Sequence, residues 1–261
     1  MIVVKFGGHA MKDENGNFAK AISAALATGE KVVVVHGGGP QIDAALKAKQ
    51  ITSDWIGGFR VTTQEIFDVV EDVLVNQVGH EVAATLAKSG IKAKAISARE
   101  LPTVIARRRT TLIDGTPADL GFVGEVQSVN PSQLLELLAD GFVPVVAPIS
   151  SDEDLKTGLN VNADFSAAAI AAALGASALI VMTDVAGIYR SWPDKSSLID
   201  VITAAELESI KAVFAEGMAP KVQAALDALS FGAKAVRIVD GTDPDSFASA
   251  LVGSGGTLVV A

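Results

Sequence analysis

The sequence contains no cysteine among its 261 residues. Disulfide bonds, thiolate metal sites and cysteine nucleophiles are therefore excluded, and we expect a protein of the reducing cytoplasm. It also has no apolar run near the roughly 20 residues that cross a bilayer. Met1 is followed directly by a strand-like segment, without a basic region and a long apolar stretch, so we expect neither a membrane span nor a secretory leader.

Positive charge is scarce as well. Lys and Arg number 21 against 30 Asp and Glu, which gives a net charge of -9. This balance disfavours general binding to nucleic acid or to an anionic membrane. An anionic substrate would therefore need cations gathered at its own site, because the overall field of the protein opposes it.

Hydrophobic residues make up 49% of the chain, enough for one large α/β domain or two lobes that share a sheet. Apolar, β-branched runs alternate with segments that have apolar residues at helical spacing, and this favours a doubly wound, mostly parallel sheet. Strands are predicted at 2–6, 31–36, 93–97, 142–147, 178–183, 235–239 and 257–261. Helices are predicted at 18–26, 64–90 (long or broken), 132–141, 163–175 and 220–232.

Residues 103–128 interrupt this alternation and predict hairpins, with Asp114 and Gly115 in a tight turn. Such an insertion can be a lid over a site or an ordinary surface hairpin, and the sequence leaves both open. The same region carries consecutive arginines at 107, 108 and 109. These predict a solvated face or a role in steering substrate.

Two glycine-rich turns, KFGG (5–8) and HGGG (36–39), follow predicted strands. The carboxyl edge of an open α/β sheet is where ligands bind, and bare backbone N–H groups suit phosphate oxygens. Neither turn matches GxGxxG or the P-loop. We interpret them as an anion cradle, with tight strand–helix turns as the alternative. His36 is interpreted as a packed strand-end residue.

Two further segments carry charged residues at predicted helix starts. Asp164 lies in NVNAD before a small-residue helix, where it could also be only a cap. Lys221 follows Pro220 in the first turn of another helix, where a cation opposes the helix dipole. An anion placed between the lysine and the helix would explain this position, and a lysine in water is the alternative.

Taken together, the sequence resembles the amino-acid kinase family along nearly its whole length, and within it the acetylglutamate branch. The matching segments, in order, are VVKFGGHAM, VVVVHGGGPQI, GGFRVTT, LGFVGEV, NVNAD, TDVAGIY and GMAPKV. GGFRVTT and NVNAD favour that branch over carbamate, aspartate and uridylate kinases.

The resemblance implies roles for individual residues. Lys5 and Lys221 would stabilise charge on a transferring phosphoryl group, and Asp164 would hold both lysines. Arg60 would bind the α-carboxylate of the substrate. The other implied substrate-binding residues are Asn160, Gly38 and Gly39. The implied nucleotide-binding residues are Gly8, which faces phosphate, and Asp184, Val185, Ala186, Gly187, Ile188, Tyr189, Val213, Phe214 and Ala215.

The implied fold is a three-layer α/β/α sandwich with a mostly parallel open sheet. Residues 1–175 would form a lobe for substrate binding and dimerisation, and residues 176–261 an ATP-binding lobe on the same sheet. The implied reaction is ATP-dependent phosphorylation of the side-chain carboxylate of N-acetyl-L-glutamate, a step of arginine biosynthesis. A carboxyl group with a pKa near 4 is already ionised at neutral pH, so no general base is needed. No all-protein metal cage is evident, so Mg²⁺ should arrive with ATP.

Two alternatives stay open: a kinase for α-aminoadipate or glutamate carried on a small acidic protein, and a non-catalytic nucleotide-binding module. Like charge disfavours the first, and the presence of both lysines with Asp164 disfavours the second. The first predicted strand begins at Ile2, which leaves no residues for the amino-terminal helix of arginine-inhibited hexamers. The resemblance therefore implies a homodimer insensitive to arginine, and the long helix at 64–89, which has more apolar residues than one buried face requires, is its expected interface.

Overall fold

A computed structural model describes residues 1–7, 16–100, 102–214 and 217–261. Its main sheet has eight strands in the order β12-β14-β13-β11-β1-β2-β8-β5, and only the β13–β14 pair is antiparallel. The strands are β1 (Ile2–Phe6), β2 (Val32–His36), β5 (Ala93–Ser97), β8 (Val143–Ala147), β11 (Ala178–Thr183), β12 (Val201–Thr203), β13 (Ala235–Asp240) and β14 (Thr257–Val260). The predicted mostly parallel sheet is confirmed.

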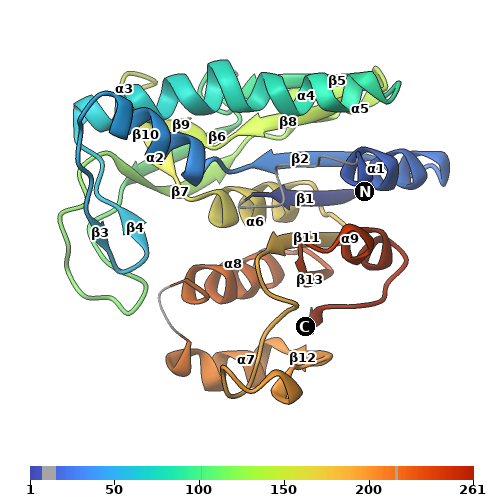
Figure 1. Cartoon of the computed structure of the whole chain (residues 1–261). Coiled ribbons are helices and arrows are strands. Elements are labelled where there is room, and N and C mark those ends of the chain that lie inside the picture. Colours follow the sequence, from blue (N-terminus) through green and yellow to red (C-terminus); the bar gives the residue numbers. More distant parts are fainter. Residues whose placement is uncertain (8–15, 101, 215–216) are drawn as a thin grey trace.

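Helices cover both faces of the sheet (Figure 1). One face carries α1 (Asn17–Ala27), α2 (Gly39–Ala48), α3 (Gln64–Glu71), the π-helical η2 (Asp72–Val78), α4 (Gly79–Lys88) and α9 (Pro244–Leu251). The other carries α5 (Ser132–Ala139), α6 (Ala163–Ala173), α7 (Ala204–Ile210) and α8 (Ala219–Ser230). Because strand side chains alternate between faces, Val4 packs into the first core and Val3 into the second. The three-layer sandwich is therefore confirmed.

The region predicted as hairpins forms part of a small closed barrel. The barrel consists of β6 (Val104–Arg108), β7 (Val123–Val129), β9 (Ile149–Ser151) and β10 (Gly158–Val161). Gly115 has a φ of 85° in a turn closed by the Thr111–Pro117 bridge, as the Asp114-Gly115 pair predicts. A separate short hairpin, which the sequence pattern did not predict, pairs β3 (Trp55–Ile56) with β4 (Phe59–Arg60).

The predicted long helix is one rod made of α3, η2 and α4. Its large apolar residues, including Phe67, Leu74 and Leu86, are buried in the core of this chain. Its exposed positions are mainly polar, such as Asp68 and Gln77. These apolar residues are buried because the rod covers the sheet along its length. The expectation that this rod forms a dimer interface stays a prediction.

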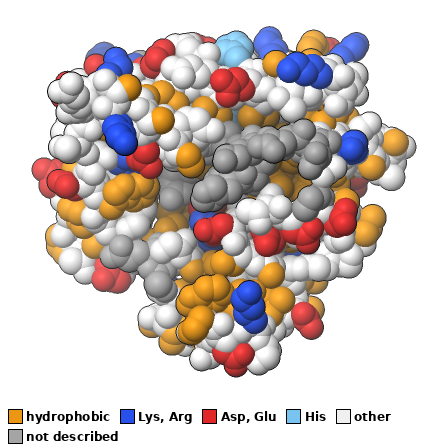
Figure 2. Space-filling model, in the orientation of Figure 1, with side chains coloured by type: hydrophobic (Ala, Val, Ile, Leu, Met, Phe, Trp, Pro, Cys, Tyr) orange, Lys and Arg blue, Asp and Glu red, His pale blue; other side chains and the backbone are white. Residues whose placement is uncertain are grey.

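The surface is mixed in charge. Acidic and basic side chains are interspersed on the face that Figure 2 shows. Among the helices of the described residues, none has both the length and the apolar character needed to span a bilayer.

Candidate active site

A cavity of about 580 Å³ lies at the carboxyl ends of β1 and β2. Figure 1 shows that these ends face α2 and the β3–β4 hairpin. Both glycine turns reach this edge, as predicted from their place after two parallel strands. Eight predicted site residues line this one cavity: Lys5, Gly38, Gly39, Arg60, Asn160, Asp164, Asp184 and Lys221.

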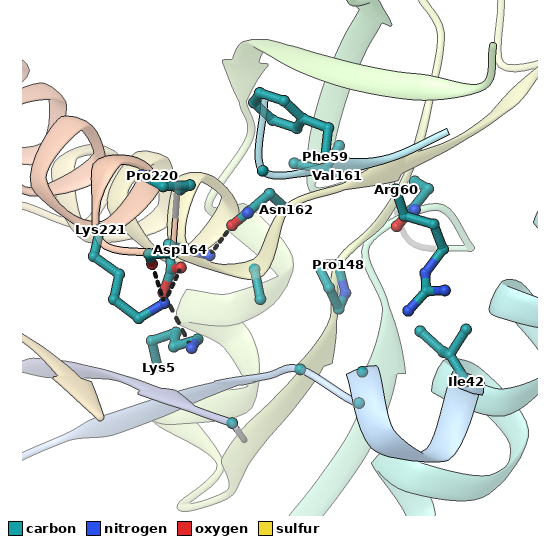
Figure 3. Close-up of a pocket in the computed structure, with 18 of the residues that line it drawn as sticks. Lys5, Ile42, Phe59, Arg60, Pro148, Val161, Asn162, Asp164, Pro220 and Lys221 are labelled. Carbon is teal, nitrogen blue, oxygen red and sulfur yellow. Dashed lines mark hydrogen bonds and ion pairs between the residues drawn. The ribbon is translucent and has the colours of Figure 1, made fainter. Parts of the chain in front are cut away.

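Two lysines converge on one buried carboxylate in this cavity (Figure 3). The Nζ of Lys5 lies 3.1 Å from Oδ1 of Asp164. The Nζ of Lys221 lies 3.4 Å from Oδ2 of the same carboxylate. Two cations against one anion leave a local excess of positive charge, which is what an anionic ligand requires in a chain with a net charge of -9.

Local structure explains why these three side chains meet. Lys5 shares the strand face of Val3, so it points to the side that α6 and α8 cover. Asp164 is the second residue of α6, where the side chain of Asn162 caps the helix by accepting the backbone N–H of Asp164 at 2.8 Å. Lys221 lies in the first turn of α8, directly after Pro220. Asp164 is thus bonded to both lysines and is more than a cap.

Burial and charge act on these groups in opposite directions. Burial lowers the pKa of Lys5, the charge of Asp164 raises it and the charge of Lys221 lowers it, with a lowered pKa as the result. Burial alone would raise the pKa of Asp164, but Lys5 and Lys221 together hold it below the ordinary value. Asp164 is therefore a carboxylate at neutral pH.

The glycines of the two turns are small for different structural reasons. A Cβ at Gly7 would lie 3.0 Å from the Nζ of Lys5, so this glycine leaves room for the lysine. A Cβ at Gly38 would lie 2.5 Å from Cδ2 of Leu74, so this glycine lets η2 approach the turn. A Cβ at Gly39 would meet no atom within 4 Å. Gly39 therefore leaves open space beside the cavity at the start of α2.

Arg60 lies at the other end of the cavity from the lysines (Figure 3). Its Nη1 donates to Oγ of Ser53 at 2.6 Å, and its Nη2 to Oδ1 of Asp43 at 2.7 Å. The guanidinium also stacks on Trp55, with Cζ 4.6 Å from the ring centroid. These contacts hold Arg60 in one orientation although it lies in a two-residue strand.

Asn160 lies on β10 beside the same cavity. Its Nδ2 donates to Oγ1 of Thr62 at 3.2 Å. Thr62 is fully buried two residues after Arg60 and donates its hydroxyl to the Arg60 carbonyl. Asn160 and Arg60 are thus linked through one buried threonine, which fixes their relative placement.

The residues implied to bind nucleotide are less concentrated. Asp184 lines the cavity, whereas Ile188 is buried in the core and its backbone N–H donates to Oγ1 of Thr257. Tyr189 packs edge-on against Trp192, and Val213 is 68% exposed. Of the others, Val185, Ala186, Gly187 and Phe214 are described but do not line this cavity. Gly8 and Ala215 lie outside the described residues.

His36 is fully buried at the end of β2. Its Nδ1–H donates to the Gly37 carbonyl at 2.8 Å. Burial lowers the pKa of the imidazole to about 4, with only partial opposition from this hydrogen bond. The interpretation as a packed strand-end residue is confirmed, because the ring is neutral and closed to solvent.

Sequence reasoning missed the apolar walls of the cavity. Trp55 and Phe59 come from the β3–β4 hairpin, and Leu74 from η2. The double glycine at 57–58, both with positive φ, was the available signal for this hairpin. The predicted hairpin region contributes only Val123, so it does not form the lid. Among the described residues, no group of three His, Asp or Glu side chains could hold a metal ion.

Paired ammonium groups and bare glycine turns at the carboxyl edge of a parallel sheet define a site for phosphoryl transfer, a reaction governed by positioning and positive charge. The comparisons with known proteins agree. Residues 1–240 match the model of the amino acid kinase family, and the chain belongs to that family.

Similar proteins include acetylglutamate kinases. The one from Beutenbergia cavernae is 44% identical over 247 residues, which cover 94% of this chain and 79% of that protein. The one from Arthrobacter sp. strain FB24 is 46% identical over 252 residues, with coverage of 94% and 81%.

Solved structures share the fold. The smu.665 protein of Streptococcus mutans UA159 matches with a TM-score of 0.83 and 29% identity, covering 99% of this chain and 98% of that one. A carbamate kinase from Giardia matches with a TM-score of 0.70 at 16% identity, covering 99% and 98%, which shows the fold alone.

Proposed function

We propose that this chain phosphorylates the side-chain carboxylate of N-acetyl-L-glutamate with ATP, forming N-acetyl-L-glutamyl 5-phosphate and ADP for arginine biosynthesis. The observation that carries the proposal is a single cavity with Lys5 and Lys221 on Asp164 at one end and Arg60 at the other. The acetylglutamate kinases that cover most of this chain at 44–46% identity support it.

The chemistry suits this arrangement. An oxygen of the substrate carboxylate attacks the γ-phosphorus, a new O–P bond forms, and the bond to the β–γ bridging oxygen breaks as ADP leaves. The nucleophile is ionised at neutral pH, so no residue has to remove a proton. His36, buried and neutral, is not required. The cost lies in bringing one anion onto another, and Lys5 and Lys221 would reduce it by stabilising charge on the transferring group.

Substrate would span the cavity. Arg60 would take the α-carboxylate, because a guanidinium offers paired donors to a carboxylate. Asn160 would bind nearby, and Gly38 and Gly39 would present backbone to the phosphoryl and substrate end. Trp55 and Phe59 supply apolar surface beside Arg60. The side-chain carboxylate would then point toward the lysines.

The nucleotide would lie on the side of the cavity formed by Asp184, with residues 185–189, 213 and 214 behind it. Residues 1–175 would then hold substrate and residues 176–261 ATP, with β1 and β11 adjacent in the shared sheet. Kinases of this family use ATP. Asp184 is the only carboxylate besides Asp164 among the described residues that line the cavity, so Mg²⁺ would be held mainly by the phosphates.

We also propose a homodimer, on family resemblance. The outer face of the α3–η2–α4 rod would form its interface. Light scattering at micromolar protein would measure the mass directly, and a monomer or a hexamer would contradict the proposal. Unchanged activity in millimolar arginine is the matching expectation for regulation.

The deciding experiment measures ADP release in MgATP with N-acetyl-L-glutamate, run beside L-glutamate, L-aspartate and N-acetyl-L-aspartate. We expect turnover with N-acetyl-L-glutamate alone. Absence of turnover with ATP still bound would reject the proposal and favour a carrier-protein substrate or a non-catalytic nucleotide-binding role.

A further inference from the structure

The three consecutive arginines of the β6–β7 region have three different environments. The Nη2 of Arg107 pairs with Glu125 at 2.9 Å on the surface, and its side chain is 66% exposed. Arg108 is also exposed and lies over Phe122, with Cζ 4.2 Å from the ring centroid. Arg109 alone is partly buried. The run is therefore not a uniform solvated face.

The Arg109 guanidinium lies against two aromatic rings that stack on each other. Its Cζ lies 4.6 Å from the centroid of Phe59 and 5.5 Å from that of Phe165. The two rings are 6.1 Å apart and nearly parallel, at 14°. The Nε–H of Arg109 donates to the Thr111 carbonyl at 2.8 Å, which fixes the guanidinium plane. A cation near two ring faces attracts both rings.

The two rings belong to the neighbours of two site residues. Phe59 directly precedes Arg60 on β4, and Phe165 directly follows Asp164 on α6. Phe59 is 3% exposed and packs with Leu120 and Val123 in a small core that Phe165 also contacts. Arg109 therefore joins the strand that carries one end of the cavity to the helix that carries the other.

We propose that Arg109 is a positioning residue that sets the spacing between Arg60, which holds the substrate, and Asp164, which holds the two lysines. This inference rests on the proposed function. Because β3 and β4 are only two residues each, ladder hydrogen bonds alone give the hairpin little rigidity. The Arg109 guanidinium supplies a fixed contact between the hairpin and α6.

The consequence concerns the geometry of the bound substrate. Without the guanidinium, β4 can shift relative to α6. Arg60 then holds the substrate less firmly, which raises KM, and the substrate carboxylate spends less time within reach of the γ-phosphorus, which lowers kcat. Reaction rates are sensitive to misplacement of about 1 Å. Arg109 is not among the described residues that line the cavity, so nucleotide binding should not change.

The test compares Arg109→Gln with Arg107→Gln, which removes the arginine two residues earlier, on β6. For Arg109→Gln we expect KM for N-acetyl-L-glutamate to rise about 10-fold, equivalent to about 1.4 kcal/mol, with KM for MgATP within about 2-fold of wild type. Arg107→Gln should change neither constant. Arg109→Lys, which keeps the cation, should return KM to within about 3-fold of wild type.

A second readout does not need turnover. In a Trp192→Phe background the only remaining tryptophan is Trp55, which lies on the same hairpin and against Arg60. The fluorescence anisotropy of Trp55 should fall in Arg109→Gln as the hairpin gains motion, and stay constant in Arg107→Gln. This measurement separates failure of the positioning role from failure of the proposed reaction.

Two results would overturn the inference. One is equal KM values and equal Trp55 anisotropy in the two glutamine variants. The other is a loss of kcat and thermal stability in Arg109→Gln with no change in either KM or in anisotropy, which indicates a general structural role. If wild type itself shows no turnover, the anisotropy comparison alone decides.

Discussion

Arg60 and Asp43 form an ion pair of 2.7 Å in which the two partners differ sharply in exposure. The Arg60 side chain is 5% exposed, whereas that of Asp43 is 60% exposed. A carboxylate largely in water is screened and contributes little as an ion pair. A substrate carboxylate that enters the cavity can therefore compete for the same guanidinium at small cost.

Replacing Arg60 should mainly weaken substrate binding. We expect Arg60→Gln to raise KM for N-acetyl-L-glutamate by about 100-fold, since loss of one partner of a desolvated charge pair is costly. KM for MgATP should stay within about 2-fold. Asp43→Asn is the matched control and should change the substrate KM by less than about 5-fold. Initial-rate kinetics in both substrates measure this, and equal effects of the two variants would contradict the assignment of Arg60.

Removing either lysine should act on turnover. Lys5→Ala and Lys221→Ala are each expected to lower kcat by about 10² to 10³, the usual loss for one preorganised donor. The dissociation constant for ATP, measured by equilibrium titration, should change far less than kcat. Near-normal turnover in one of the variants would remove the proposed role of that lysine.

The pH profile should show an alkaline limit set by Lys5. Burial lowers the pKa of its ammonium below 10.5. As pH rises through this lowered value, Lys5 loses the charge that the reaction needs, so kcat should fall at a pH below 10.5. An arginine at position 5 stays charged throughout this range. The alkaline fall of kcat should therefore be absent in Lys5→Arg, whatever the absolute rate of that variant. If kcat falls at the same alkaline pH in both proteins, the fall is due to another titrating group.

Seven of the eight strands of the main sheet were predictable to within a residue or two, as for β1, β11 and β14. Their β-branched runs are buried on both faces, so local composition and tertiary environment agree. The strands β3, β4, β9, β10 and β12 were not predicted. They are two to four residues long, and their pairing depends on partners distant in the sequence, which local patterns do not encode.

The site was predictable where a charged residue occupies an unusual place in its strand or helix. Lys5 after a buried strand and Lys221 in the first turn of a helix each occupy unusual places, and both reach Asp164. The cation–aromatic contacts of Arg109 were not predictable, since they depend on two rings from separate elements. The dimer surface expected on the long helix stays a prediction, because a single chain does not show which of its faces meets a second copy.

His36 should make the protein sensitive to mild acid through stability and not through catalysis. Its folded pKa of about 4 lies below the unfolded value of about 6.5. The unfolded chain therefore binds more protons between these values, and stability is complete above pH 6.5 and is lost as pH falls toward 4. The loss from this residue is about 3 kcal/mol at most. Urea unfolding of wild type and His36→Gln at several pH values should show a shallower slope for the variant over this window.

Alanine substitutions at two adjacent glycines should have different effects, one on stability and the other on activity. An alanine at Gly38 places its Cβ 2.5 Å from Cδ2 of Leu74, so it must displace a buried side chain of η2. We expect Gly38→Ala to lower the free energy of unfolding by about 1–3 kcal/mol, as overpacking does. Denaturant unfolding at neutral pH measures this loss.

Gly39→Ala meets no atom within 4 Å and lies in the first turn of α2. Alanine is a better helix former than glycine, so stability should be unchanged or slightly higher. The added methyl group nevertheless occupies space where the proposed phosphoryl group and substrate meet bare backbone, and kcat/KM should fall about 10-fold or more. If Gly39→Ala keeps full activity, the HGGG turn serves only to bring η2 and β2 together, and its role as an anion cradle is wrong.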